Sequence, residues 1–363
     1  MSILIFLAVL GVLVLVHEWG HFIVAKKSGM RVDEFGIGFP PKIFSIRRGE
    51  TLYTLNLFPI GGFVKIYGED ADAPKEGVEY ARSFSGQNKW KQSAVLLAGV
   101  TMNVLFAWFL FSLAFATGIQ TSVTEAEAGP SAKLMITGVM PDGPAADAAF
   151  TSGMTIVGVH ASGSTLTTLT PTEFSAFVSD HKDLPITIAY SVDSVLHEIV
   201  VIPEAGVIAE DPERAAVGVS LALIETVRKP LLTAITDGFT HTVRSTRDIA
   251  VGLYGLVRDA VLFKADLSSV AGPIGIVGLV GEASAFGFTT LLMFTAFISL
   301  NLAVINILPF PALDGGRLLF VLIEAVKGSS INPRFTQILN ATGFILLILL
   351  MVAVTWNDIA RLM

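Results

Sequence analysis

The sequence predicts a polytopic α-helical membrane protein with four transmembrane helices, a β-hairpin and an inserted small β-rich soluble domain. Composition gives the first indication, because 52% of the residues are hydrophobic and only 15% are charged, whereas soluble domains carry about 25% charged residues. The second indication is a set of four long apolar runs. The third is a middle section in which short β-prone runs alternate with Gly, Pro and Asp. The net charge of -7 argues against nucleic acid as a partner. The chain contains no cysteine, which excludes disulfides and thiolate metal sites.

The four apolar runs cover residues 2–25, 93–119, 286–313 and 338–356. Each is long enough to cross about 30 Å of hydrocarbon, which takes about 20 helical residues. The first run has the position of a signal peptide. It lacks a basic start and a small-residue cleavage site, and it carries three ionisable groups. We therefore expect it to be a transmembrane helix.

Basic residues predict the orientation in the membrane. Residues 26–91 contain eleven Lys and Arg, and residues 317–334 contain three more. Because cytoplasmic loops carry an excess of Lys and Arg, we expect these two segments in the cytoplasm. Both termini and the middle section are then expected on the other side.

The middle section contains short β-prone runs separated by Gly, Pro and Asp. These runs are residues 132–139, 155–159, 186–191 and 197–202. A short amphipathic helix is expected at residues 171–181 with Thr170 as its cap. Residues 230–262 mix apolar and charged positions, which predicts a helix at the membrane surface. The expected divisions are a membrane core (1–118), a soluble domain (122–205), a linker with the membrane-surface helix (206–285) and a second membrane core (286–363).

The most specific motif is His17-Glu18-Trp19-Gly20-His21. On a helix, His17 and His21 lie one turn apart on the same face, so both imidazoles can reach one zinc ion. Glu18 lies beside them, where it can take a proton from a water molecule. The alternative is that these are hydrogen-bonded packing residues, but burying three such groups in a membrane helix is costly.

A zinc hydrolase site needs a third protein ligand and one open position. Asp314 is the best candidate, at the end of the third apolar run. It follows Pro309 and Pro311 and precedes Gly315 and Gly316, so the helix must be interrupted there. Irregular backbone at membrane depth is tolerated where it is buried in protein or lines a wet cavity. Alternatively, Asp314 only caps the following helix, and the spacing alone does not decide between these readings.

Together these residues resemble the site-2 protease family of intramembrane zinc metalloproteases. The segments that carry the resemblance are HEWGH in the first membrane segment and NILPFPALDGG in the third. The resemblance implies that Zn²⁺ is the cofactor, Asp314 the third zinc ligand and Glu18 the catalytic base. By the same resemblance, Asn306 contacts substrate or stabilises the oxyanion. Asn301 is a further substrate-binding candidate, with a helix–helix hydrogen bond as the alternative.

Other stretches are similar to the same family. Residues 35–39 and 57–65 resemble its membrane-embedded β-hairpin region, and residues 98–103 resemble its second membrane segment, with Val100 where proline is common. The middle section looks like a single PDZ domain, although Gly153-Met154 stands where Gly-Asp is customary.

The β-prone segments 53–57 and 63–67 are separated by a bend at residues 59–62. We expect them to form a hairpin whose free edge binds an unwound substrate as an added strand. The alternative is an ordinary cytoplasmic hairpin that covers the membrane domain. The candidate substrate-binding residues on the edge are Gly62, Phe63, Val64, Lys65 and Ile66.

The resulting hypothesis is a zinc-dependent endopeptidase that cleaves transmembrane segments of single-pass membrane proteins, such as an anti-sigma factor or remnant signal peptides. It would span a bacterial inner membrane several times, with the active site toward the cytoplasm. One alternative is a non-catalytic zinc-binding membrane adaptor that uses the PDZ-like domain. A closed structural zinc site needs a fourth protein ligand, and none is obvious. A zinc transporter is disfavoured because no inverted repeat is evident.

Overall fold

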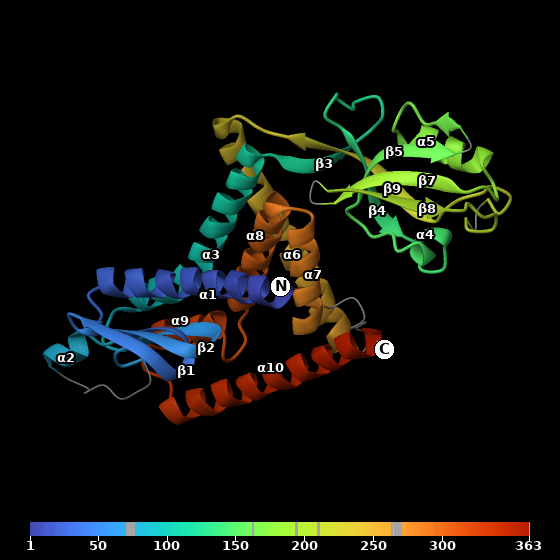
Figure 1. Ribbon diagram of the computed structural model, residues 1–363. Coiled ribbons are helices and arrows are strands. Elements are labelled where there is room, and N and C mark those ends of the chain that lie inside the picture. Colours follow the sequence, from blue (N-terminus) through green and yellow to red (C-terminus); the bar gives the residue numbers. More distant parts are fainter. Residues whose placement is uncertain are drawn as a thin grey trace. The chain divides into compact units, whose positions relative to one another are not determined.

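The computed structural model describes residues 1–69, 77–161, 163–192, 195–208, 211–262, 264 and 271–362 (Figure 1). The chain forms two compact units. Unit 1 comprises Met1–Ala116 and Pro230–Met363, and unit 2 comprises Thr117–Lys229.

Unit 1 contains four helices that are long and apolar enough to cross a membrane, among the residues that the structure describes. Each coincides with one of the predicted apolar runs. The third is shorter than its apolar run, because Pro309 and Pro311 cannot continue a regular helix. The four helices are α1 (Ser2–Lys27), α3 (Lys89–Thr117), α8 (Phe288–Asn306) and α10 (Pro333–Leu362).

Shorter or more polar helices complete unit 1: α2 (Val78–Ala81), α6 (Leu231–Val261), α7 (Pro273–Ala285) and α9 (Asp314–Lys327). Helix α6 packs along α3, where the Trp108 indole donates to the carbonyl of Ile235 at 3.0 Å. Gly238 faces Ser112 so closely that a β-carbon there would lie 2.3 Å from its hydroxyl. The predicted helix over residues 230–262 is therefore present as α6, and its position at a membrane surface stays a prediction.

Unit 1 also contains a β-sheet built from two long strands, β1 (Val32–Arg48) and β2 (Thr51–Ile66), which pair antiparallel. The chain reverses between them at residues 49–50. Residues 34–37 of β1 pair with residues 52–55 on one side and with residues 62–65 on the other. The sheet packs against α1.

This register corrects the predicted hairpin. Segments 53–57 and 63–67 were expected to pair with each other across a bend at residues 59–62. Instead β1 lies between the two parts of β2 and pairs with both. Each segment alone is equally β-prone, so local sequence does not show which neighbour it pairs with. The segment 62–66 is an edge of the sheet, because no described strand pairs with its outer side.

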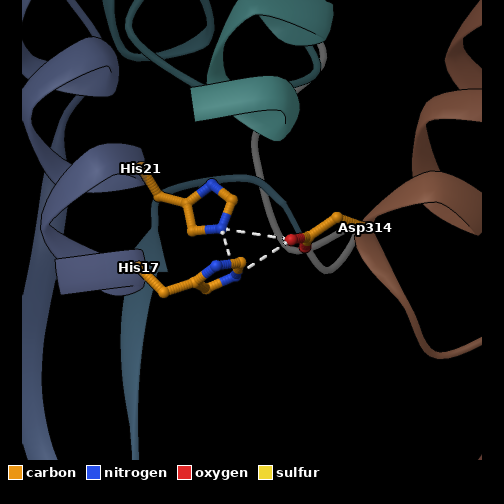
Figure 2. A group of neighbouring side chains, drawn as sticks. All are labelled: His17, His21 and Asp314. Atoms are coloured by element: carbon orange, nitrogen blue, oxygen red, sulfur yellow. Dashed lines mark hydrogen bonds and ion pairs between the residues drawn. The ribbon is translucent and has the colours of Figure 1, made fainter. Parts of the chain in front are cut away.

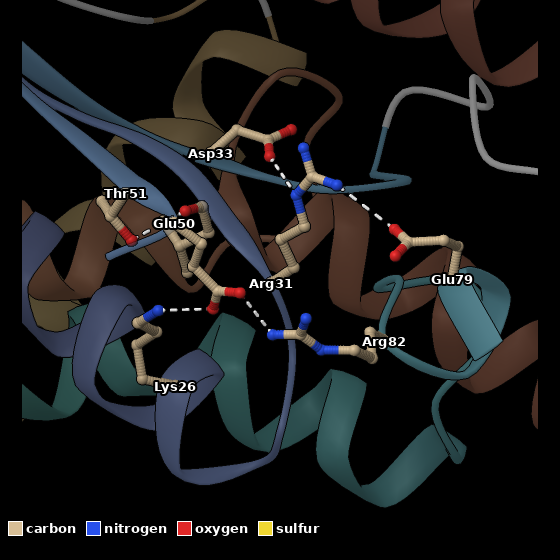
Figure 3. Close-up of polar contacts among 8 residues, drawn as sticks. Lys26, Arg31, Asp33, Glu50, Thr51, Glu79 and Arg82 are labelled. Carbon is tan, nitrogen blue, oxygen red and sulfur yellow. Dashed lines mark hydrogen bonds and ion pairs between the residues drawn. The ribbon is translucent and has the colours of Figure 1, made fainter. Parts of the chain in front are cut away.

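Ion pairs fix the β1–β2 turn to the end of α1 (Figure 3). Glu50 in the turn accepts from Lys26 of α1 at 2.7 Å and also from Arg82, beside α2. Thr51 donates to the carbonyl of Val32 at 2.8 Å. Hydrogen bonds from Lys26 and Arg82 hold the pKa of the Glu50 carboxyl below its ordinary value.

Unit 2 is built on an antiparallel sheet with strand order β3-β9-β4-β5-β7-β8, and β6 pairs with β5. One hydrophobic core, which includes Ile136, Ile156 and Phe174, lies between this sheet and helix α5. The elements are β3 (Ile119–Val123), β4 (Lys133–Val139), α4 (Pro144–Asp147), β5 (Thr155–Ala161), β6 (Ser164–Thr165), α5 (Pro171–Asp180), β7 (Ile186–Val192), β8 (Val195–Val201) and β9 (Val219–Val227).

The four predicted β-prone runs lie in β4, β5, β7 and β8, and the predicted cap Thr170 accepts from the backbone N–H of Glu173 at 3.2 Å. Strand β9 was not predicted, because it falls in the stretch 206–285, which was expected to be a linker and a helix. This strand lies between β3 and β4, so the sheet cannot be complete at residue 205.

Candidate metal centre

The two histidines of the HEWGH motif lie one turn apart on α1 and point toward Asp314 (Figure 2). Both are buried, with 7% and 8% of their surface exposed. The helix persists through these polar residues because the flanking segment is apolar and long and contains no proline. The predicted helical spacing of the two imidazoles is therefore present.

Three potential ligand atoms meet at one point. The Nε2 atoms of His17 and His21 lie 3.1 and 3.3 Å from Oδ2 of Asp314, and 3.2 Å from each other. Zinc bonds of 2.0–2.1 Å in a tetrahedral arrangement place neighbouring ligand atoms about 3.3 Å apart. Among the described residues, these three form the one group of His, Asp and Glu side chains close enough to hold a metal ion. Their spacing fits three corners of a zinc tetrahedron.

An irregular turn between α8 and α9 brings Asp314 to the histidines. Ala312 adopts a left-handed conformation with φ of 75°, which is uncommon for a residue with a side chain. A β-carbon at Gly315 would lie 2.2 Å from the carbonyl oxygen of Ile307. A β-carbon at Gly316 would lie equally close to the carbonyl oxygen of Phe310. Because both positions are glycine, α9 can begin directly against the turn. Asp314 is the first residue of α9, and its carboxylate contacts the histidines.

The outer nitrogens of both imidazoles also have partners. His21 Nδ1 lies 2.8 Å from the carbonyl of Val95, so it must be protonated, which leaves Nε2 with a free lone pair. His17 Nδ1 lies 3.1 Å from the side-chain amide nitrogen of Asn103. The oxygen of that amide is buried without a hydrogen-bond partner.

The unpartnered oxygen of Asn103 indicates which way the amide must face when a metal is bound. Amide oxygen and nitrogen positions are assigned from the hydrogen-bond network. With the amide turned over, Oδ1 accepts from His17 Nδ1–H, and both histidines then present Nε2 to the metal. The Asn103 side chain is fully buried, and its backbone carbonyl accepts from Ser299 of α8 at 2.8 Å. The residues present therefore fit a zinc ion.

Gly99 provides the space that the histidines need. A β-carbon at this position of α3 would lie 2.4 Å from Nε2 of His21 and 2.8 Å from Nε2 of His17. Neither Gly99 nor Asn103 was predicted to have a role in the site, although both lie in the 98–103 stretch that resembles the family's second membrane segment. Their spacing of four, which places them on one helix face, was the available signal.

A cavity of about 180 Å³ opens beside the ligands. Its lining includes Glu18, His21 and Asp314 together with the sheet edge, so the predicted base and the predicted substrate-binding strand meet in one space. The strand residues in the lining are Gly62, Phe63, Val64 and Ile66.

Three predicted site residues do not line this cavity: Lys65 and Asn301, predicted to bind substrate, and Asn306, predicted to be catalytic. Asn301 donates to the carbonyl of Phe297 in its own helix at 2.9 Å, and its contact with substrate stays a prediction. Lys65 lies on the edge with an exposed side chain. Asn306 is the last residue of α8, at the start of the turn that carries Asp314.

Glu18 is available for chemistry. Within the described part of the chain, no hydrogen bond or ion pair occupies its carboxylate. A β-carbon at Gly62 would lie 3.3 Å from Cγ of Glu18, so the sheet edge passes directly beside this side chain. A proton acceptor, two of the three candidate metal ligands and an unpaired strand edge therefore share one cavity.

The chain is similar to known zinc metalloproteases over nearly its whole length. A family model described as peptidase family M50 matches residues 5–350. The zinc metalloprotease RasP of Oceanobacillus iheyensis is 31% identical, covering 99% of both chains. A putative zinc metalloprotease of Clostridium perfringens is 33% identical over 99% of this chain and 98% of its own. The regulator of sigma-W protease RasP of Bacillus subtilis is 30% identical over 99% of both.

Proposed function

The chain belongs to peptidase family M50 and is a zinc metalloprotease of the membrane, and from this premise we propose that it cleaves transmembrane segments of single-pass membrane proteins within the bilayer. The observation that carries the proposal is the shared cavity, in which Glu18 and two metal ligands lie beside an unpaired strand edge. The products would be two shorter membrane peptides.

In this proposal His17, His21 and Asp314 hold the zinc, and Asn103 and Val95 keep the two imidazoles oriented. Bound zinc supplies Lewis-acid chemistry, which lowers the pKa of water and polarises the peptide carbonyl. The cavity beside His21 and Asp314 would leave a bound zinc ion open to water and substrate. An open position of this kind is what separates a catalytic zinc site from a closed structural one.

Glu18 serves as the general base that takes a proton from the attacking water, and it then delivers this proton to the leaving amine. Its place beside His17 on α1 and in the cavity lining supports this role. Asn306 is proposed to stabilise the developing oxyanion. Support for Asn306 comes from the family resemblance and from its place at the start of the Asp314 turn.

Substrate is proposed to bind as an added strand on residues 62–66. A transmembrane helix shields its own carbonyls, so it must unwind before cleavage, and its freed backbone groups then need partners. The open side of the edge strand offers such partners without demanding a particular side-chain sequence. Gly62 permits the close approach of this edge to Glu18.

We propose that the catalytic site lies toward the cytoplasm of a bacterial inner membrane, which the segments rich in Lys and Arg support. Unit 2 would then lie on the opposite side, as a PDZ-like domain that restricts which substrates reach the membrane site. One relative is named a regulator of a sigma factor, so an anti-sigma factor with one transmembrane segment is the substrate that we would test first.

The decisive experiment is cleavage of a single-pass transmembrane peptide by the purified protein in lipid vesicles. We expect wild-type protein to cleave it, chelation of zinc to stop cleavage, and added Zn²⁺ to restore it. Glu18→Gln should keep its zinc, because Glu18 is not a ligand, while cleavage falls by about 10²–10⁴-fold. Wild-type turnover by Glu18→Gln would refute the mechanism. A zinc-loaded wild-type protein that cleaves no membrane peptide would favour the adaptor hypothesis.

A further inference from the structure

The cavity of the metal centre is also lined by a pair of opposite charges that the proposed mechanism does not use. Arg317 Nη1 lies 2.7 Å from Oε1 of Glu69, and both residues line the cavity. The Glu69 side chain is only 12% exposed, and that of Arg317 is 36% exposed. A pair that is partly shielded from water is screened less by salt than a surface pair.

Each partner lies close in the chain to one half of the site. Arg317 follows Asp314 by three residues, so it lies one turn farther along the same side of α9. Glu69 follows the edge strand, and its backbone N–H donates to the carbonyl of Ile66 at 3.3 Å. The ion pair therefore links the helix that begins with the third ligand to the strand edge that is proposed to bind substrate.

We propose that Glu69 and Arg317 are positioning residues that hold the strand edge and Asp314 at one spacing, so that a bound substrate strand presents a single peptide bond to the metal. The inference rests on the proposed function, because it concerns the alignment of a strand bound at residues 62–66. Neither residue takes part in bond cleavage.

The need for such a device follows from how strands bind. Main-chain hydrogen bonds hold any sequence equally well, and successive residues along a strand are about 3.3 Å apart. A shift of about 1 Å between the edge and the metal would move the scissile carbonyl away from the productive position, and a misplacement of this size can slow a reaction about 100-fold. The affinity of the strand edge for substrate would change much less than the rate of cleavage.

A second ion pair on α9 provides a matched control. Glu324 lies seven residues after Arg317, on the same helix face, and its Oε2 is 2.5 Å from Nζ of Lys89 at the start of α3. This pair also fixes α9, but neither partner lines the cavity. If ion pairs only stabilise α9, then breaking either pair should have the same effect on activity.

The test compares zinc content, kcat, KM and the cleaved bond, identified by mass spectrometry, for a transmembrane peptide in vesicles. For Glu69→Gln and Arg317→Gln we expect kcat to fall about 10- to 100-fold with little change in KM or zinc, and cleavage to spread to neighbouring bonds. The double variant should be no worse than either single variant, because the two residues act as one unit. Arg317→Lys and the exchange of Glu69→Arg with Arg317→Glu, which keep a charge pair, should recover most of kcat and the single cleaved bond.

Glu324→Gln should leave both kcat and the cleaved bond as in wild type. The inference is overturned if Glu69→Gln and Arg317→Gln retain wild-type kcat, if their effects multiply in the double variant, or if Glu324→Gln lowers kcat equally. Loss of zinc from Glu69→Gln would also overturn it, because the pair would then support the metal site itself. Failure of wild-type protein to cleave any membrane peptide would instead refute the proposed function.

Discussion

The substitution Gly99→Ala tests the metal centre by adding a single methyl group. This group would replace a hydrogen of α3 that faces both histidines. Its carbon would lie 2.4 Å from Nε2 of His21, 2.7 Å from Cε1 of His17 and 2.8 Å from Nε2 of His17. Non-bonded contacts of this kind normally exceed about 3.4 Å. The histidine ring or helix α3 must therefore move by about 1 Å.

A movement of this size is large compared with the tolerance of a metal site, in which ligand distances hold to about 0.2 Å. Loss of one orienting partner alone typically lowers metal affinity about 10- to 100-fold. Displacement of a metal ligand itself should lower zinc affinity at least as much, so we expect Gly99→Ala to bind zinc about 100-fold or more weakly. Helix α3 itself should gain about 1 kcal/mol, because alanine is a better helix former than glycine.

The assay is zinc content by mass spectrometry after equilibration with a chelator of known affinity, together with the melting temperature. We expect Gly99→Ala to remain folded but to contain little zinc and to cleave no substrate. Gly11→Ala, in the helix that carries both histidines, is the control, because a β-carbon there meets nothing within 4 Å. Full zinc occupancy and normal cleavage in Gly99→Ala would refute this account of the centre.

Four further predictions concern single contacts. Asn103→Leu should lower zinc affinity about 10- to 100-fold. Asn103→Asp keeps a hydrogen-bond acceptor for His17 and should therefore retain zinc. Equal losses of zinc affinity in the two variants would contradict the proposed amide orientation. Asp314→Ala should contain less zinc than wild type in metal analysis, and Asn306→Ala should keep zinc and mainly lower kcat. The backbone N–H groups of the neighbouring residues Val64 and Lys65 point to opposite edges of the strand, so we would replace each of them by proline in turn. The variant that removes the N–H facing the open edge should have a higher KM with zinc content unchanged. Normal kinetics in both variants would mean that substrate binds elsewhere. Because the pKa of Glu50 is lowered in the folded protein, its ionised form stabilises the fold above its ordinary pKa, and this contribution is lost as the pH falls through the lowered value. As the pH falls below the ordinary pKa of glutamate, the melting temperature of wild type should therefore decrease more steeply than that of Glu50→Gln, and parallel curves would show that the turn contacts do not contribute.

The sequence alone determined the features that depend on local pattern. Four apolar runs predicted the four described helices that are long and apolar enough to cross a membrane, since about 20 apolar residues suffice. The spacing of His17 and His21 predicted two imidazoles on one helix face, because the helical period is fixed by the backbone. The HEWGH and NILPFPALDGG segments predicted the family, which the comparisons confirmed. The four β-prone runs of the middle section also became strands.

Only the tertiary structure decided which distant segments meet. It placed β1 between the two parts of β2, and it inserted β9 between β3 and β4. It also brought Asn103 and Gly99 against the histidines, and Glu69 against Arg317 across the cavity. These contacts join residues far apart in the chain, and a strand or a polar side chain carries no local mark of the partner that it will meet. Helical period and apolar length are properties of a short segment, whereas register and side-chain pairing arise only when the whole chain packs.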